Sequence, residues 1–391
     1  MPIVNRLADL ATDITAWRRD FHAHPELQFD VHRTAGIVAE KLRAFGCDEV
    51  VTGIGQTGVV GVIKGRETGS GRVMGMRADM DALPILEATG KPYASQTPGK
   101  MNACGHDGHT AMLLGAAQYL AETRNFDGTV AVIFQPAEEG GGGGKAMVED
   151  GLMERFGIQQ VYGMHTAPGR PLGHISTRPG PLLAAADEFE VHITGVGGHA
   201  AYPHECVDTT LIGAQMLQAM QSVVARNVDP IKSAVVSVTL FEVDSNATNV
   251  IAETVRLKGT VRTLDTEISY LVEERMARIA EHTAKAFGAK AEFRYRRYYP
   301  VTVNHPAETD FAVSVAADVL GADAVSGDAP PQLGAEDFSF MLNERPGAFV
   351  FLGNGDTAYV HHPEYDFDDE AIPVGCSYWA RLAEKGMPFG A

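Results

Sequence analysis

Three side chains that could bind a metal ion lie within six residues of the sequence, Cys104, His106 and His109. Asp107 lies among them, and an apolar run from Thr110 to Leu120 follows. Thiolate, imidazole and carboxylate groups at such spacing bind zinc and similar divalent ions. A short C-x-H motif has low specificity, and the same residues could simply pack or lie at the surface. The segment predicts metal ligands on a loop ahead of a helix, provided that other segments supply the remaining ligands.

Further candidate ligands follow apolar segments that are typical of β-strands. These residues are Asp79 and Asp81 after Arg72–Met76, Glu138 and Glu139 after Thr129–Phe134, His165 after Gln160–Met164, and His361 after Ala348–Leu352. In open α/β sheets, functional groups collect just beyond the carboxyl ends of the strands. Acidic residues that cap a turn are an equally good interpretation of Asp79 and Asp81. The adjacent carboxylates of Glu138 and Glu139 repel each other unless a cation or a shared proton relieves them, which favours a metal.

Together these residues offer one thiolate, three imidazoles and carboxylates, the mixed ligand set of zinc or a similar ion. One carboxylate is left over for proton transfer. Successive side chains of extended backbone point in opposite directions, so Cys104 and His106 can face one ion with Gly105 between them. By the same rule Glu138 and Glu139 should not point at one spot, which suggests one ligand and one base.

The length of 391 residues exceeds an ordinary single core and predicts two domains. Residues 1–186 and 300–391 have the pattern of a discontinuous α/β domain. The helices and strands expected between 187 and 299 follow the order βαββαβ of a ferredoxin-like α+β unit, large enough to be an inserted domain.

Composition limits the partners and the compartment. With 45% hydrophobic and 21% charged residues and a mean hydropathy of −0.08, the chain resembles soluble globular proteins. A net charge of −18 argues against nucleic acid and anionic membranes as partners. We find no apolar run of roughly 18 residues and no signal-peptide core. The four cysteines are far apart and form no C-x-x-C, so we expect a reducing, cytoplasmic location.

Two glycine-rich segments resemble nucleotide loops only superficially. Residues 53–58 match G-x-G-x-x-G, but a β-rich stretch follows where a dinucleotide loop needs a helix, so a hairpin turn is the better interpretation. Gly144-Lys145 has the wrong spacing for a phosphate loop, and Ala146 stands where a magnesium ligand would be. We expect the run Gly140–Gly144 to be a flexible loop near a ligand.

The same motifs resemble the aminoacylase/carboxypeptidase family of metallo-amidohydrolases, and within it the branch of hippurate hydrolases and auxin–amino acid conjugate hydrolases. The resemblance extends from about His22 to Asp369. The segments that carry it are CGHDGHTA from Cys104, QPAEEGGGG from Gln135, GMH from Gly163, GVGGHAAYPH from Gly195 and HHPEYDFDDE from His361. It implies a metallo-exopeptidase-like catalytic domain with an inserted lid domain, two divalent metal ions (zinc or manganese), and a homodimer or higher homo-oligomer formed through the lid.

The resemblance also implies roles for individual residues. The implied metal ligands are Cys104, His106, Glu139, His165 and His361, with Cys104 as the bridging thiolate. Glu138 would be the general base, and the H-x-P pattern of the family selects His361 over His362.

Three further residues are implied to act from the lid. His199, in related enzymes often supplied by the partner subunit, would polarise the scissile carbonyl. Asn249 and Arg262 would bind the carboxylate end of the substrate; solvated strand-edge residues are the alternative interpretation.

The expected activity is hydrolysis of N-acyl amino acids, with aroyl or acetyl groups, to a carboxylic acid and a free amino acid. A dipeptidase or aminopeptidase on the same scaffold and a non-catalytic ligand-binding relative remain alternatives. The metalloprotease motif H-E-x-x-H is absent, since residues 204–208 read HECVD.

The sequence departs from the branch at three positions. Asn102 replaces a usual His, and Ala252 and Thr209 each replace a usual Pro. None of them removes a reacting group.

Overall fold

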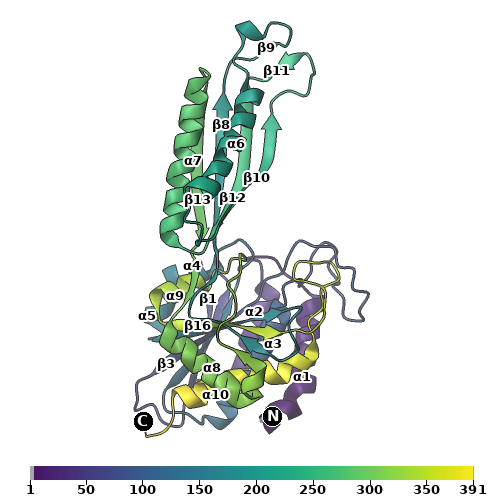
Figure 1. The fold of residues 1–391 in the computed structure, drawn as a ribbon. Helices are drawn as coiled ribbons and strands as arrows, with labels where there is room; N and C mark the ends of the chain where they lie inside the picture. The colour runs from purple at the N-terminus through teal and green to yellow at the C-terminus, as the bar shows by residue number, and fades with distance from the viewer. Residues whose placement is uncertain (1–3, 391) are drawn as a thin grey trace. The chain divides into compact units, whose positions relative to one another are not determined.

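A computed structural model describes residues 4–390, and its chain divides into two compact units. The first unit comprises Met1–Leu182, Val303–Pro330 and Asp337–Ala391, and the second comprises Leu183–Thr302 and Pro331–Glu336. Figure 1 shows the course of the chain from the N-terminus in purple to the C-terminus in yellow.

The first unit is built on an eight-stranded sheet with the order β1-β2-β4-β3-β5-β16-β6-β15. Its strands are β1 (Glu49–Ile54), β2 (Gly58–Lys64), β3 (Val73–Asp79), β4 (Thr129–Gln135), β5 (Gln160–Ala167), β6 (Ile175–Ser176), β15 (Val325–Ser326) and β16 (Gly347–Gly353). The central strands β4, β3, β5 and β16 are parallel to one another. Their carboxyl ends therefore meet at one edge of the sheet, where functional groups collect in α/β proteins.

Helices cover this sheet, as Figure 1 shows. They are α1 (Asn5–Ala23), α2 (His32–Ala44), α3 (His106–Thr123), α4 (Gly143–Glu149), α5 (Leu152–Arg155), α8 (Pro306–Leu320), α9 (Ser339–Glu344) and α10 (Ile372–Gly386). The most buried of the long helices is α3, which packs against α1, α10 and β3. Because it is apolar on nearly every side, α3 is a core helix and holds its first turn firmly at the sheet edge.

The second unit contains a four-stranded antiparallel sheet with the order β10-β12-β8-β13. Its elements are β8 (Ala185–Thr194), α6 (Thr209–Arg226), β10 (Ala234–Val243), β12 (Thr254–Thr263), α7 (Thr266–Ala286) and β13 (Lys290–Tyr299). The short strands β9 (Gly198–His199) and β11 (Val250–Ile251) pair separately, as do β7 (Gly180–Leu183) and β14 (Thr302–Asn304). Both long helices begin at aspartate caps, Asp208 and Asp265, whose side chains accept backbone N–H groups.

This arrangement confirms the expected fold class, an α/β unit interrupted by a ferredoxin-like α+β unit. Strands β1 and β2 form an antiparallel hairpin around residues 53–58, as predicted. One expectation was wrong: the glycine run is no extended flexible loop, because α4 begins at Gly143. Gly143 and Gly144 are buried, and a Cβ at Gly143 would lie 1.7 Å from the Pro136 carbonyl oxygen, so close packing is what requires glycine there.

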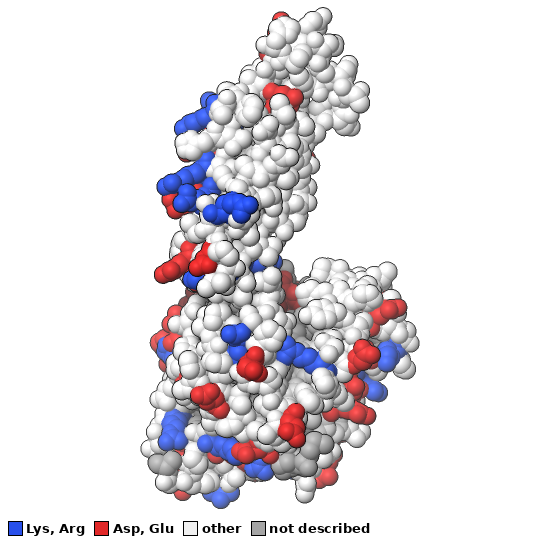
Figure 2. Space-filling model, in the orientation of Figure 1, with Lys and Arg blue, Asp and Glu red and all other residues white. Residues whose placement is uncertain are grey.

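Within residues 4–390, none of the helices has the length and apolar character needed to cross a membrane. Acidic and basic side chains are interspersed over the visible face of the first unit (Figure 2).

A buried charge network joins α1 to the first turn of α3. The ring of His22 lies between two carboxylates, with Nδ1 2.8 Å from Asp107 and Nε2 3.2 Å from Glu87. Arg18 approaches the same Asp107 at 3.5 Å, and its guanidinium lies over the ring of Tyr93. Burial opposes the charged form of His22, but Asp107 and Glu87 outweigh it and raise its pKa to about 9. The imidazolium is the form that can donate to both carboxylates at once.

We expect this network to make stability depend on pH. His22 has a raised pKa in the folded protein and an ordinary one near 6.5 when unfolded, so its contribution is fully present below pH 6.5. The contribution declines as the pH rises from 6.5 through 9 and amounts to at most about 3 kcal/mol. Urea unfolding at pH 6 and pH 9.5 should therefore show a larger loss of stability for the wild type than for His22→Gln.

The matched control is His32→Gln, which changes a histidine with a 76% exposed side chain. It should lose the same unfolding free energy between the two pH values as the wild type. Equal losses for the wild type and His22→Gln would contradict the assignment.

Candidate metal centre

The five ligands suggested by the sequence, together with Glu138, converge at the carboxyl edge of the first unit's sheet. Their potential ligand atoms lie within 4.8 Å of one another in three overlapping groups: Cys104, His106 and His165; Cys104, Glu139 and His361; and His106, Glu138 and Glu139. Within the first group, Cys104 Sγ lies 3.3 Å from His165 Nε2. Cys104 belongs to two of the groups and His106 to two.

Cys104 and His106 face the same space for a reason other than the predicted one. The connecting Gly105 is not extended but left-handed, with φ of +87°, and is the cap residue directly before α3. A Cβ there would lie 2.5 Å from both the Thr166 side chain and the Tyr365 hydroxyl. Only glycine is compatible with this turn, because a side chain would be strained by the backbone angle and would collide with its neighbours. His106 thus lies on the first helical turn and not on a loop.

The expectation that Glu138 and Glu139 point apart was wrong. They lie in a turn, and both have an oxygen near His106. The preceding Ala137 has φ of +54°, unusual for a residue with a side chain, and this reverses the chain directly after β4. The alternation rule of extended strands does not apply to such a turn.

Asp81 holds this turn in place. Its carboxylate is buried and accepts the backbone N–H of Glu138 at 2.9 Å and that of Glu139 at 3.1 Å. Its carbonyl oxygen also accepts a hydrogen bond from His106 Nδ1 at 2.8 Å. One residue therefore orients both carboxylates and one imidazole.

His165 lies within β5 and not beyond it. Its Nδ1 donates to the Thr166 carbonyl at 2.6 Å, which leaves the lone pair of Nε2 directed at Cys104. Burial is the largest influence on His165 and lowers its pKa well below the usual value. The neutral imidazole is the form that binds metal ions.

His361 reaches the cluster from the loop after β16. Its backbone φ of +66° is again left-handed, and its N–H donates to the Ala103 carbonyl at 2.7 Å. Its Nε2 lies 3.4 Å from Glu139 Oε1. The neighbouring His362 instead uses its Nδ1 to accept the Glu364 N–H. Left-handed backbone at both Ala137 and His361 places strain beside this cluster, a frequent property of functional sites.

The chemistry of the cluster fits divalent cations. His106 Nε2 and Glu139 Oε1 are buried and lack a hydrogen-bond partner among residues 4–390. Burial and the neighbouring Glu139 and Glu138 raise the pKa of the Cys104 thiol well above its usual value. A nearby cation would supply the missing partner and stabilise the thiolate, and such coupling is typical of metal ligands.

Asp79 borders the cluster, with Oδ2 3.7 Å from His106 Nε2, but both of its carboxylate oxygens already accept hydrogen bonds. Its carboxylate accepts from Arg77 at 2.7 Å and from His109 Nδ1 at 2.7 Å. His109 Nε2 in turn accepts the backbone N–H of Thr166 at 2.9 Å, so both ring nitrogens are used. His109 therefore supports the strand that carries His165 and is not oriented as a metal ligand.

The lid residues suggested by the sequence lie in the second unit. His199 and Asn249 are neighbours, because β9 pairs with β11 and the Ala200 N–H donates to the Asn249 carbonyl at 3.0 Å. His199 Nδ1 accepts the Ala201 N–H at 3.1 Å, so the neutral ring carries its proton on Nε2. Arg262 is distant from this pair, at the other end of β12, opposite Ala186 of β8.

The three departures from the branch pattern have local structural explanations. Asn102 is buried and donates to the Phe21 carbonyl of α1 at 3.1 Å. Thr209 and Ala252 contact each other, and the Thr209 hydroxyl donates to the Ala252 carbonyl at 2.7 Å. Where the branch has two prolines, this chain has a hydrogen bond.

A family model for peptidase family M20/M25/M40 matches residues 75–385. The chain belongs to this family. It is 40% identical to a hippurate hydrolase of Campylobacter jejuni, over 98% of this chain and 99% of that protein. It is likewise 40% identical to an N-acetylcysteine deacetylase of Bacillus subtilis, over 96% and 98% of the two chains. These matches confirm the resemblance found in the sequence.

A solved structure of the family is similar to nearly the whole chain. It is that of a Bacillus subtilis protein described as a dinuclear metal-binding peptidase of the M20 family. It superposes with a TM-score of 0.84 at 35% identity and covers 97% of this chain and 99% of that one.

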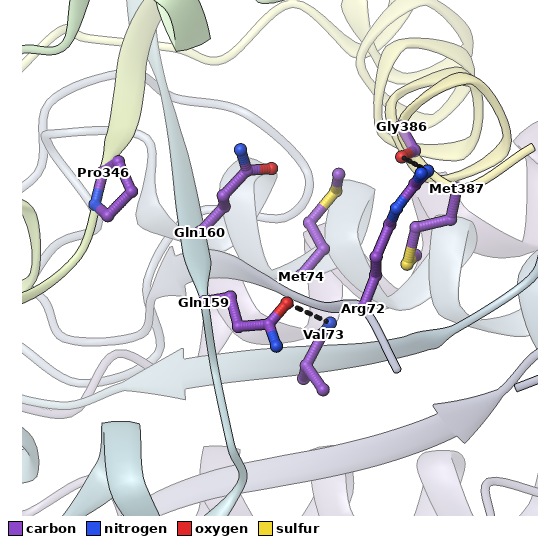
Figure 3. A pocket seen from close by; sticks show the side chains of 8 residues that line it. All are labelled: Arg72, Val73, Met74, Gln159, Gln160, Pro346, Gly386 and Met387. Carbon is purple, nitrogen blue, oxygen red and sulfur yellow. Dashed lines mark hydrogen bonds between the residues drawn. The ribbon is translucent and has the colours of Figure 1, made fainter. Parts of the chain in front are cut away.

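The peptidase fold has another recess, at the opposite edge of the sheet. About 400 Å³ in volume, it lies where β3 and β5 begin and is lined by Met74, Gln159 and Arg72 among others (Figure 3). Its polar side chains are already used, since Arg72 donates to the Gly386 carbonyl and Gln159 accepts the Val73 N–H. This recess contains none of the site residues.

Sequence reasoning recognised Asp81 only as part of an acidic cluster and did not find its role. The one signal was its place two residues after Asp79, just beyond a buried strand. Nothing in the sequence showed that its partners would be the backbone of Glu138 and Glu139, more than fifty residues away.

We expect Asp81→Asn to weaken metal binding in this M20 protein. An amide has one acceptor oxygen where the carboxylate has two, so one backbone N–H of the Glu138–Glu139 turn would face a donor. Loss of such an orienting group typically costs about 10- to 100-fold in metal affinity. Competition with a chelator would measure the change.

Asp150→Asn is the matched control, because Asp150 also accepts a backbone N–H, that of Gly55 at 3.0 Å, outside the cluster. It should leave the metal affinity unchanged. Folded Asp81→Asn protein with wild-type metal affinity would contradict the role of the Asp81 clamp, the two hydrogen bonds from the Glu138 and Glu139 N–H groups to the Asp81 carboxylate.

Proposed function

We propose that this protein is a metal-dependent amidohydrolase that cleaves N-acyl amino acids to a carboxylic acid and a free amino acid. The observation that carries the proposal is the convergence of Cys104, His106, Glu139, His165 and His361 around Glu138 at one sheet edge. The identity of 40% to a hippurate hydrolase over nearly the full length of both chains gives it further support.

Two divalent ions, zinc or manganese, are part of the proposal. Cys104 shares one group with His165 and another with Glu139 and His361, which suits a bridging thiolate between two ions. The thiolate and imidazoles favour zinc, while the carboxylates also admit manganese. Bound ions would polarise the scissile carbonyl and lower the pKa of the attacking water.

Glu138 is the residue we assign to proton transfer. It is 7% exposed, and Asp81 orients the turn that carries it. In this role it accepts a proton from the attacking water and delivers it to the leaving amine, which an amide needs because a free amide anion is a poor leaving group.

His199 is assigned to the carbonyl oxygen of the substrate. Its Nε2–H is a donor, because Nδ1 accepts the Ala201 N–H. Such a donor stabilises the oxyanion that develops on the carbonyl oxygen. Arg262 and Asn249 are assigned to the carboxylate of the same substrate.

The geometry of the second unit supports delivery of His199 by a partner subunit. Strand β12 begins at Thr254, and Arg262 is eight residues further along it, which is roughly 25 Å of extended backbone. His199 lies beyond the Thr254 end of this strand, so its distance from Arg262 is greater still. Figure 1 shows β9 and β11 beyond the ends of β8 and β12. One copy of this unit cannot bring His199 and Arg262 to the same small molecule. A homodimer or higher oligomer through residues 187–299, acting as lid and dimerisation domain, resolves this.

The small-molecule substrate and a cytoplasmic location complete the proposal. The four cysteines, Cys47, Cys104, Cys206 and Cys376, are all free thiols, which suits a reducing compartment.

We expect Glu138→Gln to lower kcat by about 10²- to 10⁴-fold while the protein retains its metal. Glutamine has nearly the same shape but cannot accept the proton. Metal content and hydrolysis of N-benzoyl- and N-acetyl-amino acids would be measured after loading with zinc or manganese.

Glu149→Gln serves as the control, since Glu149 is exposed and forms a surface ion pair with Lys145 at 3.5 Å. Full activity of metal-loaded Glu138→Gln protein would reject the mechanism. Faster cleavage of unblocked dipeptides than of N-acyl amino acids by the wild type would favour a peptidase instead.

A mixed dimer tests the shared site. Glu138→Gln and His199→Ala should each be inactive, but a heterodimer purified by two tags should have about half the wild-type activity. One of its two sites would contain both changes and the other neither. Inactive heterodimers would show that His199 does not act from the partner.

A further inference from the structure

Arg170 lies on a loop that borders the candidate metal centre. The loop follows β5, the strand of His165, and is hydrogen bonded to the loop after β16, which leads to His361. The Gly169 N–H donates to the Gly355 carbonyl at 2.9 Å, and the Gly355 N–H donates to the Arg170 carbonyl at 2.9 Å. Two loops that lead from metal ligands therefore meet at Arg170.

The guanidinium of Arg170 is close to the ligand His165. It lies 5.2 Å from the ring centre of Phe351, and Phe351 is directly opposite His165 in the β5–β16 pair. The rings of Phe351 and His165 are 6.5 Å apart and edge to face. A single aromatic ring thus separates this cation from a candidate ligand.

Arg170 has no anionic partner in the described part of the chain. Among residues 4–390 no carboxylate forms an ion pair with it and no side chain or carbonyl accepts a hydrogen bond from its guanidinium. Other arginines of this unit are paired, such as Arg77 with Asp79 and Arg345 with Glu154. Half burial is the largest influence on Arg170 and lowers its pKa, while Tyr359, an exposed ring, is the one group that opposes this.

A half-buried, unpaired cation on the loop that follows the strand of His165 is poised for an anion. Its planar donors match a carboxylate, and stacking on Phe351 leaves those donors available. The protein has a net charge of −18, so a doubly charged substrate needs a local cation to enter.

We propose that Arg170 binds a second carboxylate of the substrate, in addition to the α-carboxylate of its amino acid. This inference rests on the proposed amidohydrolase function and specifies its substrate class as N-acyl amino acids with two carboxylates. The second carboxylate can come from an acidic amino acid or from a dicarboxylic acyl group. Arg170 is then a specificity-determining residue.

The test compares matched charged and neutral substrates. One pair is N-benzoylglutamate and N-benzoylglutamine, and the other is N-succinylglycine and N-butanoylglycine. For Arg170→Gln, the charged-to-neutral ratio of kcat/KM should fall about 10- to 100-fold in one pair, chiefly through KM, as expected for a lost charge-assisted hydrogen bond. Arg170→Lys, which retains the charge, should restore part of the ratio.

The pair that responds identifies the source of the carboxylate. A fall in the glutamate pair places it on the amino acid, and a fall in the succinyl pair places it on the acyl group. Arg43→Gln, a change of an exposed arginine on α2, should leave both ratios at wild-type values. Unchanged ratios in both pairs for Arg170→Gln would overturn the proposal.

A binding measurement separates this outcome from failure of the proposed function. If wild-type protein hydrolyses none of the four compounds, the amidohydrolase assignment fails. Calorimetry of the same compounds with metal-loaded Glu138→Gln protein, with and without Arg170→Gln, then tests Arg170 independently. If the Glu138→Gln protein and the double variant Glu138→Gln/Arg170→Gln bind the charged compounds with equal affinity, the proposal for Arg170 is overturned.

Discussion

The repulsion among buried acidic groups is the constraint on which this structure depends. Glu138, Glu139 and the Cys104 thiol share one small region at the sheet edge, with Asp79 and Asp81 behind them. Ionised groups at such distances in a medium of low dielectric are costly unless cations compensate them. Arg77 and His109 compensate Asp79, and backbone N–H groups satisfy Asp81. Cys104, Glu138 and Glu139 lie beside His106 and His361, and this arrangement of acidic groups and imidazoles suits bound metal ions.

The rest of the first unit serves to hold these groups together. Parallel strands bring β3, β4, β5 and β16 to a common edge, and the buried helix α3 fixes His106 from the other side. The final orientation depends on left-handed backbone at Gly105, Ala137 and His361. Such conformations are unfavourable for residues with a side chain and persist only where surrounding contacts enforce them. The Asp81 clamp is one such contact.

The second unit imposes a different constraint, that of length. A strand of ten residues, β12, separates the tip with His199 and Asn249 from Arg262. A substrate with only one amide and a carboxylate is much shorter than that strand. This separation is the reason that the proposed shared site draws on the tip of another copy. Arg170 differs from these lid residues because it belongs to the same unit as the metal ligands.

The sequence by itself predicted the architecture, which the structure confirms, and it suggested a ligand set. Buried strands followed by polar residues, the βαββαβ order between 187 and 299, and the CGHDGHTA and QPAEEGGGG motifs were sufficient, because periodicity and motif chemistry are local properties. Tertiary structure alone decided the orientations. The Glu138–Glu139 turn, the start of α3 at His106, the Asp81 clamp and the approach of Arg170 to Phe351 all depend on contacts between segments far apart in the chain. Local rules such as strand alternation fail there because left-handed residues reverse the backbone, and only the packed neighbours determine where such reversals occur.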